Sequence, residues 1–346
     1  MRISVIVPTY NRATLLPFTL DAVLSQTRPA DEVIVVDDGS EDDTDRVLRA
    51  YEGRIHALKI PNSGDLAARN IGARVATGEL LAFCDSDDLW HPDFLARMSV
   101  LWHLEPRTTV GYSDFVTIQN ESRSTVSKFA AAPRDFWSGF RLLGNDAGVF
   151  DEPIVPKVVG FQPFFPSCMV VPSAFFRSVG GWDEGISRTV GHDFATLLRM
   201  AEHTPFGVVR LPLVDIRKHA GNYSHDVQKM ELGDSKVLEY VLATRPSLRR
   251  HRDTILNSIE KRRRAAMETA FARRDFASVR DIFHILPPDK RPALLRAKYL
   301  VAKLPAALRT SAWEALSLAG SLRSARNRRA RRSLALSAEP SQKSPD

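Results

Sequence analysis

The sequence has few cysteines and no long uninterrupted apolar run, and these absences exclude several protein classes. Its 346 residues contain only two cysteines, Cys84 and Cys168, each inside an apolar stretch, so we expect reduced core thiols rather than a disulfide scaffold or a cysteine metal site. The longest apolar stretch, residues 161–176, contains three prolines, so no segment is expected to span a bilayer. A basic segment followed by an apolar core is missing at the amino terminus, because strand-like residues begin at Ile3. With 44% hydrophobic and 26% charged residues, the sequence predicts a globular, cytoplasmic protein.

Two common nucleotide-binding loops are also missing. No Gly-x-Gly-x-x-Gly follows the first predicted strand, and no Gly-Lys-Ser/Thr loop occurs anywhere. Because these loops hold a dinucleotide or a triphosphate through backbone amides, the sequence argues against both kinds of site.

Positive charge is scarce in the first two thirds of the chain and concentrated in the rest. Residues 1–230 contain 23 Lys/Arg and 29 Asp/Glu, whereas residues 231–346 contain 25 and 12. The acidic balance of the first part argues against polyanion binding there, and we do not expect a nucleic-acid partner. The basic part predicts either a solvated helical surface or contact with an anionic membrane, at its inner face.

The first part alternates short apolar strands with amphipathic helices. This rhythm predicts an α/β fold with a mostly parallel, Rossmann-like sheet flanked by helices. Early strands are predicted over residues 3–7, 32–36, 54–60 and 80–84, a later strand over 165–171 and a helix over 194–201.

Beyond Gly233 the pattern becomes helical. Helices are predicted over residues 258–273, 277–285 and 292–304, with breaks at Arg274-Asp275 and Pro287-Pro288. We therefore expect a domain over residues 1–228, a basic α-helical region over 229–320 and a disordered Arg/Ser-rich tail over 321–346.

Polar segments follow three of the predicted strands, at the edge where parallel sheets bind ligands. Pro8-Thr9-Tyr10-Asn11-Arg12 brings an aromatic ring and a guanidinium, and Asp38 follows the second strand. Tyr10 is either a stacking platform for a base or a half-buried ring, and Asp38 either accepts hydrogen bonds from a nucleoside or belongs to a simple turn.

An acidic cluster, Asp85-Ser86-Asp87-Asp88, follows the fourth strand. Three carboxylates so close repel one another unless a cation or donor groups offset the charge, and hard oxygen ligands favour Mg²⁺ or Mn²⁺. The alternative is an acidic turn that caps the helix beginning near Pro92.

Four segments, in this order and spacing, resemble family 2 glycosyltransferases, which have the GT-A fold. They are Val5–Arg12 (VIVPTYNR), Val35–Ser40 (VVDDGS), Asn62–Gly72 (NSGDLAARNIG) and Phe83–Asp88 (FCDSDD). The similarity is dense over residues 1–115 and thinner to about 225. It implies a metal-dependent, inverting enzyme that moves a sugar from a nucleotide-diphosphate sugar to an acceptor hydroxyl, in polysaccharide or glycan biosynthesis.

The resemblance also implies roles for single residues on the donor side. Asp87, with Asp88, would bind Mn²⁺ or Mg²⁺, and His219, in a segment similar to one that closes many such domains, would be a further metal ligand or else a surface residue. Arg69 would approach the base or diphosphate, or remain a surface helix charge. The nucleotide-sugar pocket would be formed by Pro8, Thr9, Tyr10, Arg12, Asp38, Arg69, Asp85 and Ser86.

On the acceptor side, residues 180–184 (GGWDE) are similar to a Gly-Gly-Phe-Asp-Glu turn of the family, and Asp193 falls where inverting members have their catalytic base. Asp193 would take a proton from the acceptor hydroxyl, or else cap the helix that follows it. His192 stands where the family usually has Glu. We expect Trp90 in the core, while Trp182 is either a sugar-facing wall or core.

Several alternatives remain at this level. The family's processive synthases carry Gln-x-x-Arg-Trp and membrane helices, and neither occurs here, which favours a single-addition enzyme acting on a glycan or lipid-linked acceptor. A nucleotidyltransferase or a degenerate sugar-nucleotide-binding scaffold would use the same fold. Apolar residues of 294–304, interleaved with Lys and Arg, predict a helix at a membrane surface, whereas packing on the catalytic domain or a homodimer would use them equally well.

Overall fold

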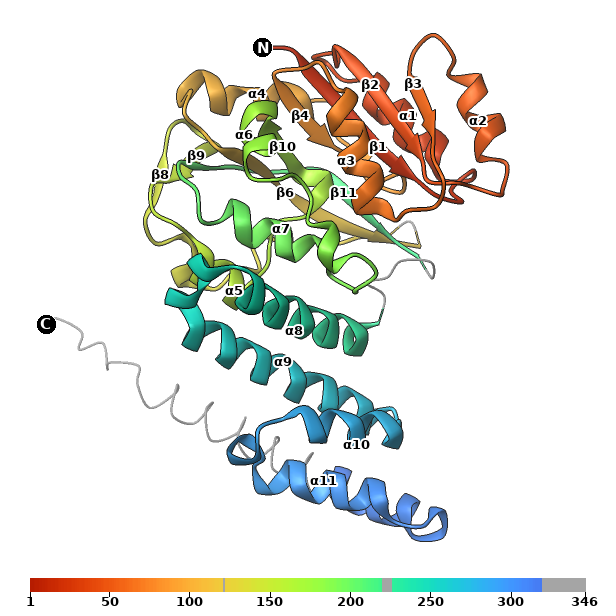
Figure 1. Ribbon diagram of the computed structural model, residues 1–346, viewed down its shortest axis with the longest axis vertical. Coiled ribbons are helices and arrows are strands. Elements are labelled where there is room, and N and C mark those ends of the chain that lie inside the picture. The colour runs from red at the N-terminus through yellow and green to blue at the C-terminus, as the bar shows by residue number, and fades with distance from the viewer. Residues whose placement is uncertain (121, 220–225, 319–346) are drawn as a thin grey trace, which may run out of the picture. The chain divides into compact units, whose positions relative to one another are not determined.

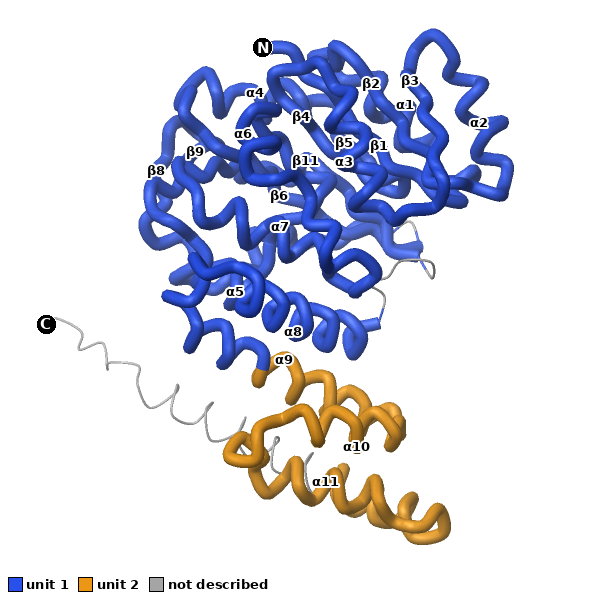
Figure 2. Tube along the Cα trace, viewed as in Figure 1, with its two compact units in different colours: residues 1–259 blue, residues 260–346 orange. Residues whose placement is uncertain are grey.

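The structure, a computed structural model, describes residues 1–120, 122–219 and 226–318. It divides into two compact units, residues 1–259 and 260–346, shown in blue and orange in Figure 2. The tail predicted over 321–346 lies outside the described residues.

Unit 1 is built on one mixed sheet with the strand order β3-β2-β1-β4-β10-β6-β11-β9-β8 (Figure 1). Strands β3, β2, β1 and β4 pair in parallel, as predicted, and β10 joins them antiparallel to both β4 and β6. The α/β fold class is therefore confirmed, but antiparallel pairing extends over more of the sheet than the early strands indicated. The strands are β1 Ile3–Thr9, β2 Glu32–Asp37, β3 His56–Lys59, β4 Leu80–Phe83, β5 Leu89–Trp90, β6 Val110–Gln119, β7 Ser122–Arg123, β8 Phe140–Leu142, β9 Ala147–Phe150, β10 Met169–Pro172 and β11 Phe206–Lys218.

The strand predicted over residues 165–171 begins later than expected. Residues Pro166–Cys168 form a short 3₁₀ turn, and only Met169 onward joins the sheet as β10. Because proline lacks an N–H, Pro166 suits the turn better than a sheet ladder.

Helices cover the sheet and set the position of its polar edge. Both β1 and β4 are completely buried, as expected for strands covered on both faces. Helix α3 lies very close to β1, because a Cβ on its Gly72 would meet Ile6 Cγ2 at 2.6 Å. The helices of this unit are α1 Leu16–Leu24, α2 Thr44–Ala50, α3 Asp65–Val75, α4 Phe94–Leu104, α5 Val155–Gly160, α6 Ser173–Ser178, α7 Asp193–Met200, α8 Val227–Thr244 and the first part of α9 Arg252–Ala272.

Unit 2 contains the rest of α9, α10 Phe276–Ile285 and α11 Ala293–Lys303. The predicted break at Arg274-Asp275 is confirmed: Arg274 has a left-handed φ of 59°, and Asp275 caps α10 by accepting a hydrogen bond from Ser278 N at 3.1 Å. The ring of Phe283 stacks on that of Tyr299 with centroids 4.1 Å apart, which joins α10 to α11.

The apolar face predicted to lie on a membrane is used inside unit 2. Leu295 and Val301 of α11 are only 3% and 9% exposed, and Lys298 is buried against Glu268. These side chains therefore stabilise the helical unit itself, and Leu294 and Leu300 are the large apolar residues of α11 that remain exposed. None of the helices within the described ranges has the length and apolarity that a bilayer span requires.

Candidate active site

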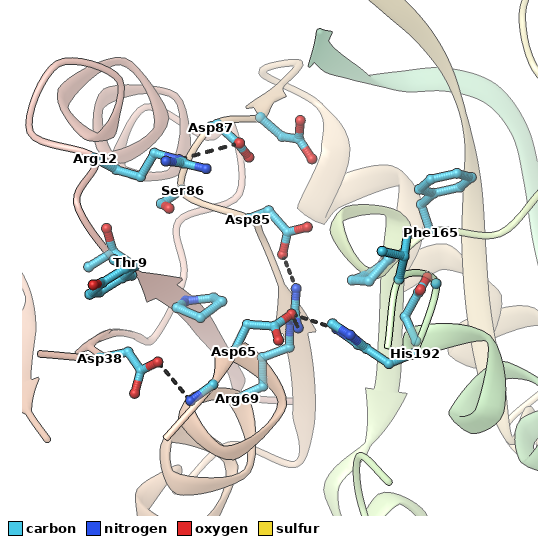
Figure 3. A pocket seen from close by; sticks show the side chains of 18 of the residues that line it. Thr9, Arg12, Asp38, Asp65, Arg69, Asp85, Ser86, Asp87, Phe165 and His192 are labelled. Atoms are coloured by element: carbon cyan, nitrogen blue, oxygen red, sulfur yellow. Dashed lines mark hydrogen bonds and ion pairs between the residues drawn. The ribbon is translucent and has the colours of Figure 1, made fainter. Parts of the chain in front are cut away.

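A cavity of about 750 Å³ opens at the carboxyl ends of β1, β2 and β4 (Figure 3). Every residue predicted for the nucleotide-sugar pocket lines it, as do Asp87, Asp88 and Asp193. The cavity therefore gathers side chains that are up to 222 residues apart in the chain, from Pro8 to Met230. His219 is not among the lining residues but contacts one of them, Asp87.

The acidic segment 85–88 is held by Ser167, which is completely buried. Its Oγ accepts a hydrogen bond from Asp85 N at 3.0 Å and donates one to Asp88 Oδ2 at 2.5 Å. Arg217 N donates to the other oxygen of Asp88 at 3.1 Å. Burial, followed by the charges of Asp87 and Asp85, raises the pKa of Asp88 well above its usual range. Asp88 is thus turned into the protein, where it fixes the shape of the segment.

Asp87 faces a histidine and an arginine. Its Oδ2 lies 3.0 Å from His219 Nε2 and 3.6 Å from Arg12 Nε. A carboxylate and an imidazole converging on one point fit Mn²⁺ or Mg²⁺ when phosphate oxygens and water supply the remaining ligands. Within residues 1–120, 122–219 and 226–318, no group of three or more His, Cys, Asp or Glu side chains forms a metal site by itself.

Arg69 is a buried cation between two carboxylates. Although it lies on helix α3, it is only 4% exposed, so its alternative as a surface helix charge is wrong. It donates to Asp85 Oδ1 at 2.6 Å and to Asp65 Oδ2 at 2.5 Å, and its guanidinium lies 5.2 Å from the ring centre of Trp182. Burial raises the pKa of Asp85 in spite of the opposing charge of Arg69.

Two tryptophans near the site belong to the core. Trp90 is 3% exposed, as predicted, and its Nε1 donates to Ser167 O at 2.7 Å. Trp182 is also 3% exposed and packs edge-on against Phe83, so it is core rather than a sugar-facing wall.

Asp38 shapes the part of the cavity that was predicted to hold the nucleotide. Its two oxygens accept hydrogen bonds from Ser63 N at 2.7 Å and from Gly64 N at 2.8 Å, and the side chain is buried. Gly64 has φ of 94°, a conformation that glycine adopts without strain, and it begins helix α3. Asp38 therefore shapes the loop before α3, while Tyr10, 43% exposed, presents its ring to the cavity.

Asp193 lines the cavity as the first residue of α7. The helix N-cap is His192, so the expectation that Asp193 caps the helix is wrong. Burial raises the pKa of Asp193, because the charged form loses hydration in the cavity wall. His192 contacts Asp65 across the cavity, with Nε2 3.0 Å from Oδ2 (Figure 3).

Sequence reasoning missed several residues of the site. Asp65 stands four residues before Arg69, a spacing that marks a helical ion pair. Nothing in the sequence marked Ser167 as a site residue, because it lies within an apolar run. Met230 of α8 also lines the cavity, and nothing in the local sequence indicates that this later helix reaches it.

Part of this chain is similar to known glycosyltransferases. Residues 4–146 match the family model described as Glycosyl transferase family 2. The validoxylamine A glucosyltransferase of Streptomyces hygroscopicus subsp. jinggangensis is 33% identical over 225 residues, which cover 58% of this chain and 51% of that protein. A putative teichuronic acid biosynthesis glycosyltransferase of Bacillus subtilis, TuaG, is 35% identical over 135 residues, 38% of this chain and 53% of that protein. The chain spans about half the length of the curated relatives that it matches.

Solved structures extend the similarity in fold beyond this region. The crystal structure of S. aureus TarS 1-349 superposes with a TM-score of 0.59 at 18% identity, covering 93% of this chain and 92% of that one. A crystal structure of the same TarS fragment in complex with UDP-GlcNAc gives a TM-score of 0.60 at 18% identity, with the same coverage. At this identity the likeness establishes a shared fold, including the helical carboxyl-terminal region.

Proposed function

Since the amino-terminal part of the chain belongs to glycosyl transferase family 2, we propose that the protein transfers a sugar from a nucleotide-diphosphate sugar to an acceptor hydroxyl, with inversion at the anomeric carbon. One observation carries this proposal. The acidic segment 85–88 and Asp193 line the same cavity, so a donor held by the first presents its sugar toward the second.

The donor would occupy the half of the cavity formed by the ends of β1, β2 and β4. Thr9, Tyr10 and Asp38 would surround the base and ribose, with the exposed ring of Tyr10 available for stacking. Arg12 and Asp85 would flank the diphosphate. A uridine diphosphate sugar is the first donor to test, because a neighbour in fold was crystallised with UDP-GlcNAc.

Asp87 and His219 would hold Mn²⁺ or Mg²⁺, with Asp88 fixing the segment rather than offering a free oxygen. Such an ion, when bound, neutralises negative charge on the departing nucleoside diphosphate. Arg12, 3.6 Å from Asp87, adds a permanent positive charge at the same place.

Asp193 would be the general base. A carboxylate in the cavity wall, opposite the diphosphate-binding segment, can accept the proton of an acceptor hydroxyl as its oxygen attacks the anomeric carbon. The raised pKa of Asp193 makes it a better proton acceptor than an exposed aspartate.

The acceptor would be a glycan or a lipid-linked saccharide. The excess of Lys and Arg in residues 231–346 supports recruitment to an anionic surface through charge, since α11 uses much of its apolar face internally. Sedimentation with vesicles of increasing anionic lipid content tests this part separately.

Product analysis decides the reaction class. The protein is incubated with UDP-, GDP- or dTDP-sugars and Mn²⁺, and release of nucleoside diphosphate together with a glycosylated acceptor is expected. Pyrophosphate as the product would instead identify a nucleotidyltransferase. Tight donor binding without turnover across a broad acceptor panel would identify a binding scaffold.

A further inference from the structure

His192 lines the cavity, but the proposed reaction gives it no role. Its Nδ1 lies 2.8 Å from the carbonyl oxygen of Thr189, and its Nε2 lies 3.0 Å from Asp65 Oδ2. The carbonyl oxygen only accepts hydrogen bonds, and so does an ionised carboxylate. Asp65 is ionised, because Arg69 and His192 lower its pKa although burial raises it.

Two acceptors facing one imidazole determine its protonation state. A neutral imidazole has a single N–H and could satisfy only one of these oxygens, which would leave a lone pair directed at the other. Only the imidazolium donates from both nitrogens. The contacts therefore require that both ring nitrogens of His192 carry hydrogen.

The bond to Asp65 attaches the loop before α7 to the donor half of the cavity, while the bond to the Thr189 carbonyl lies within that loop. Asp65 begins α3 and shares the same oxygen, Oδ2, with Arg69, which in turn holds Asp85 of the acidic segment. The loop is also confined by α8, since a Cβ on Gly191 would lie 2.3 Å from Asp234 Oδ1.

We propose that His192, held as an imidazolium by Asp65 and the Thr189 carbonyl, is a positioning residue that fixes the loop 189–193, and with it Asp193, against the donor site. Its consequence for transfer rests on the proposed function, whereas the protonation state and the order of the loop do not.

The proposal has a defined pH dependence. The charged groups around His192 are Asp65 and Arg69 on α3, Asp193 on α7, and Asp234 on α8 beside Gly191. Burial alone lowers the pKa of His192, but the hydrogen bond and charge of Asp65 outweigh it and raise the pKa above the ordinary value. The attachment is therefore complete below about pH 6.5 and is lost as the pH rises through the raised pKa, so transfer should decline on the alkaline side.

The first test uses the whole chain without substrate. Imidazole ¹⁵N shifts followed against pH should show His192 titrating with a midpoint above the ordinary value of about 6.5, with both nitrogens protonated below that midpoint. At pH 6, amide hydrogen exchange in residues 189–193 should be faster in His192→Gln, which keeps a donor but no charge, and unchanged in the matched control His203→Gln, an exposed residue outside the cavity. A midpoint at or below the ordinary value, or a loop equally protected in His192→Gln, overturns the proposal.

The second test measures transfer against pH. His192→Gln should lower kcat on the order of 10-fold near pH 7, with the donor KM changed less than about 2-fold, and should abolish the alkaline decline. Asp65→Asn should move that decline to lower pH. An unaltered pH profile in both variants overturns the positioning role. If His192 is protonated and the loop is ordered but the protein transfers no sugar, the attachment of the loop by His192 is supported. That result counts against the proposed function alone.

Discussion

Replacing Arg69 by Met tests whether the buried cation organises the site. The Arg69 side chain is 5% exposed and bonds to two carboxylates, which are 29% (Asp85) and 44% (Asp65) exposed. Breaking a buried ion pair by removing one partner costs about 3–5 kcal/mol, because the remaining charge is left uncompensated. Since both carboxylates keep some contact with water, we expect a loss near the lower end, about 3 kcal/mol.

The assay is thermal unfolding followed by tryptophan fluorescence, which mainly reports unit 1 because four of the five tryptophans lie in residues 1–259. For a unit of this size, 3 kcal/mol corresponds to a fall in Tm of about 6–12 °C. The matched control is Arg74→Met, the same change at an exposed arginine of α3, for which we expect less than about 0.5 kcal/mol.

A second substitution separates charge from packing. Adding Asp85→Asn to Arg69→Met removes one of the uncompensated charges, so the double variant should recover about 1–2 kcal/mol. The reasoning is refuted if Arg69→Met is no less stable than Arg74→Met, or if Asp85→Asn destabilises the Arg69→Met background further.

Four further predictions concern the reaction and nucleotide binding. Asp193→Asn should lower kcat about 10²–10⁴-fold with an unchanged donor KM. The control Asp45→Asn, on the exposed surface of α2, should have no effect on kcat. Loss of donor binding in Asp193→Asn would contradict the assignment of Asp193 as the general base. Because burial raises the pKa of Asp193 and only its ionised form accepts a proton, kcat of the natural protein should fall on acidification with a midpoint above about 3.9, measured as a pH–rate profile. Chelation of divalent ions should abolish transfer, and added Mn²⁺ or Mg²⁺ should restore it. The Asp87→Ala variant should need at least ~10-fold more metal to reach half of its maximal activity. Full activity in excess chelator would exclude a metal role. Asp38→Asn keeps only one of the two oxygens that accept hydrogen bonds from the amides of Ser63 and Gly64. Calorimetry should therefore find nucleotide affinity weakened about 10-fold. Equal affinity would show that the loop before α3 does not shape the nucleotide pocket.

The early part of the fold was predictable because its signals are local. Apolar runs such as Ile3–Thr9 are buried on both faces, and the polar residues that follow them mark the ends of parallel strands. The helices of unit 2 were equally readable, since Asp275 caps α10 where the periodicity breaks. The antiparallel half of the sheet was not, because β10 pairs with β4 and β6 across long stretches of sequence, and no local pattern encodes such pairing.

The features of the candidate site also divide into those that the sequence predicts and those that only the structure shows. The residue types of the cavity, carboxylates after strands and an aspartate at the start of α7, could be read directly from the sequence and its resemblance to a family. Which partner each carboxylate meets could not: Asp87 meets His219, whereas its neighbour Asp88 is bonded to Ser167.

The chain by itself thus determined the strand ends, their acidic character and their resemblance to glycosyl transferase family 2, because these signals lie in short contiguous segments. Only the folded structure decided which cations and hydroxyls offset the buried charges. From the sequence, Arg69 was either a pocket residue or a surface charge of a helix, whereas in the structure α3 packs so closely on the sheet that the Arg69 guanidinium is buried between Asp65 and Asp85. Such pairing depends on electrostatic compensation between segments far apart in sequence, which exists only once the sheet has brought them together.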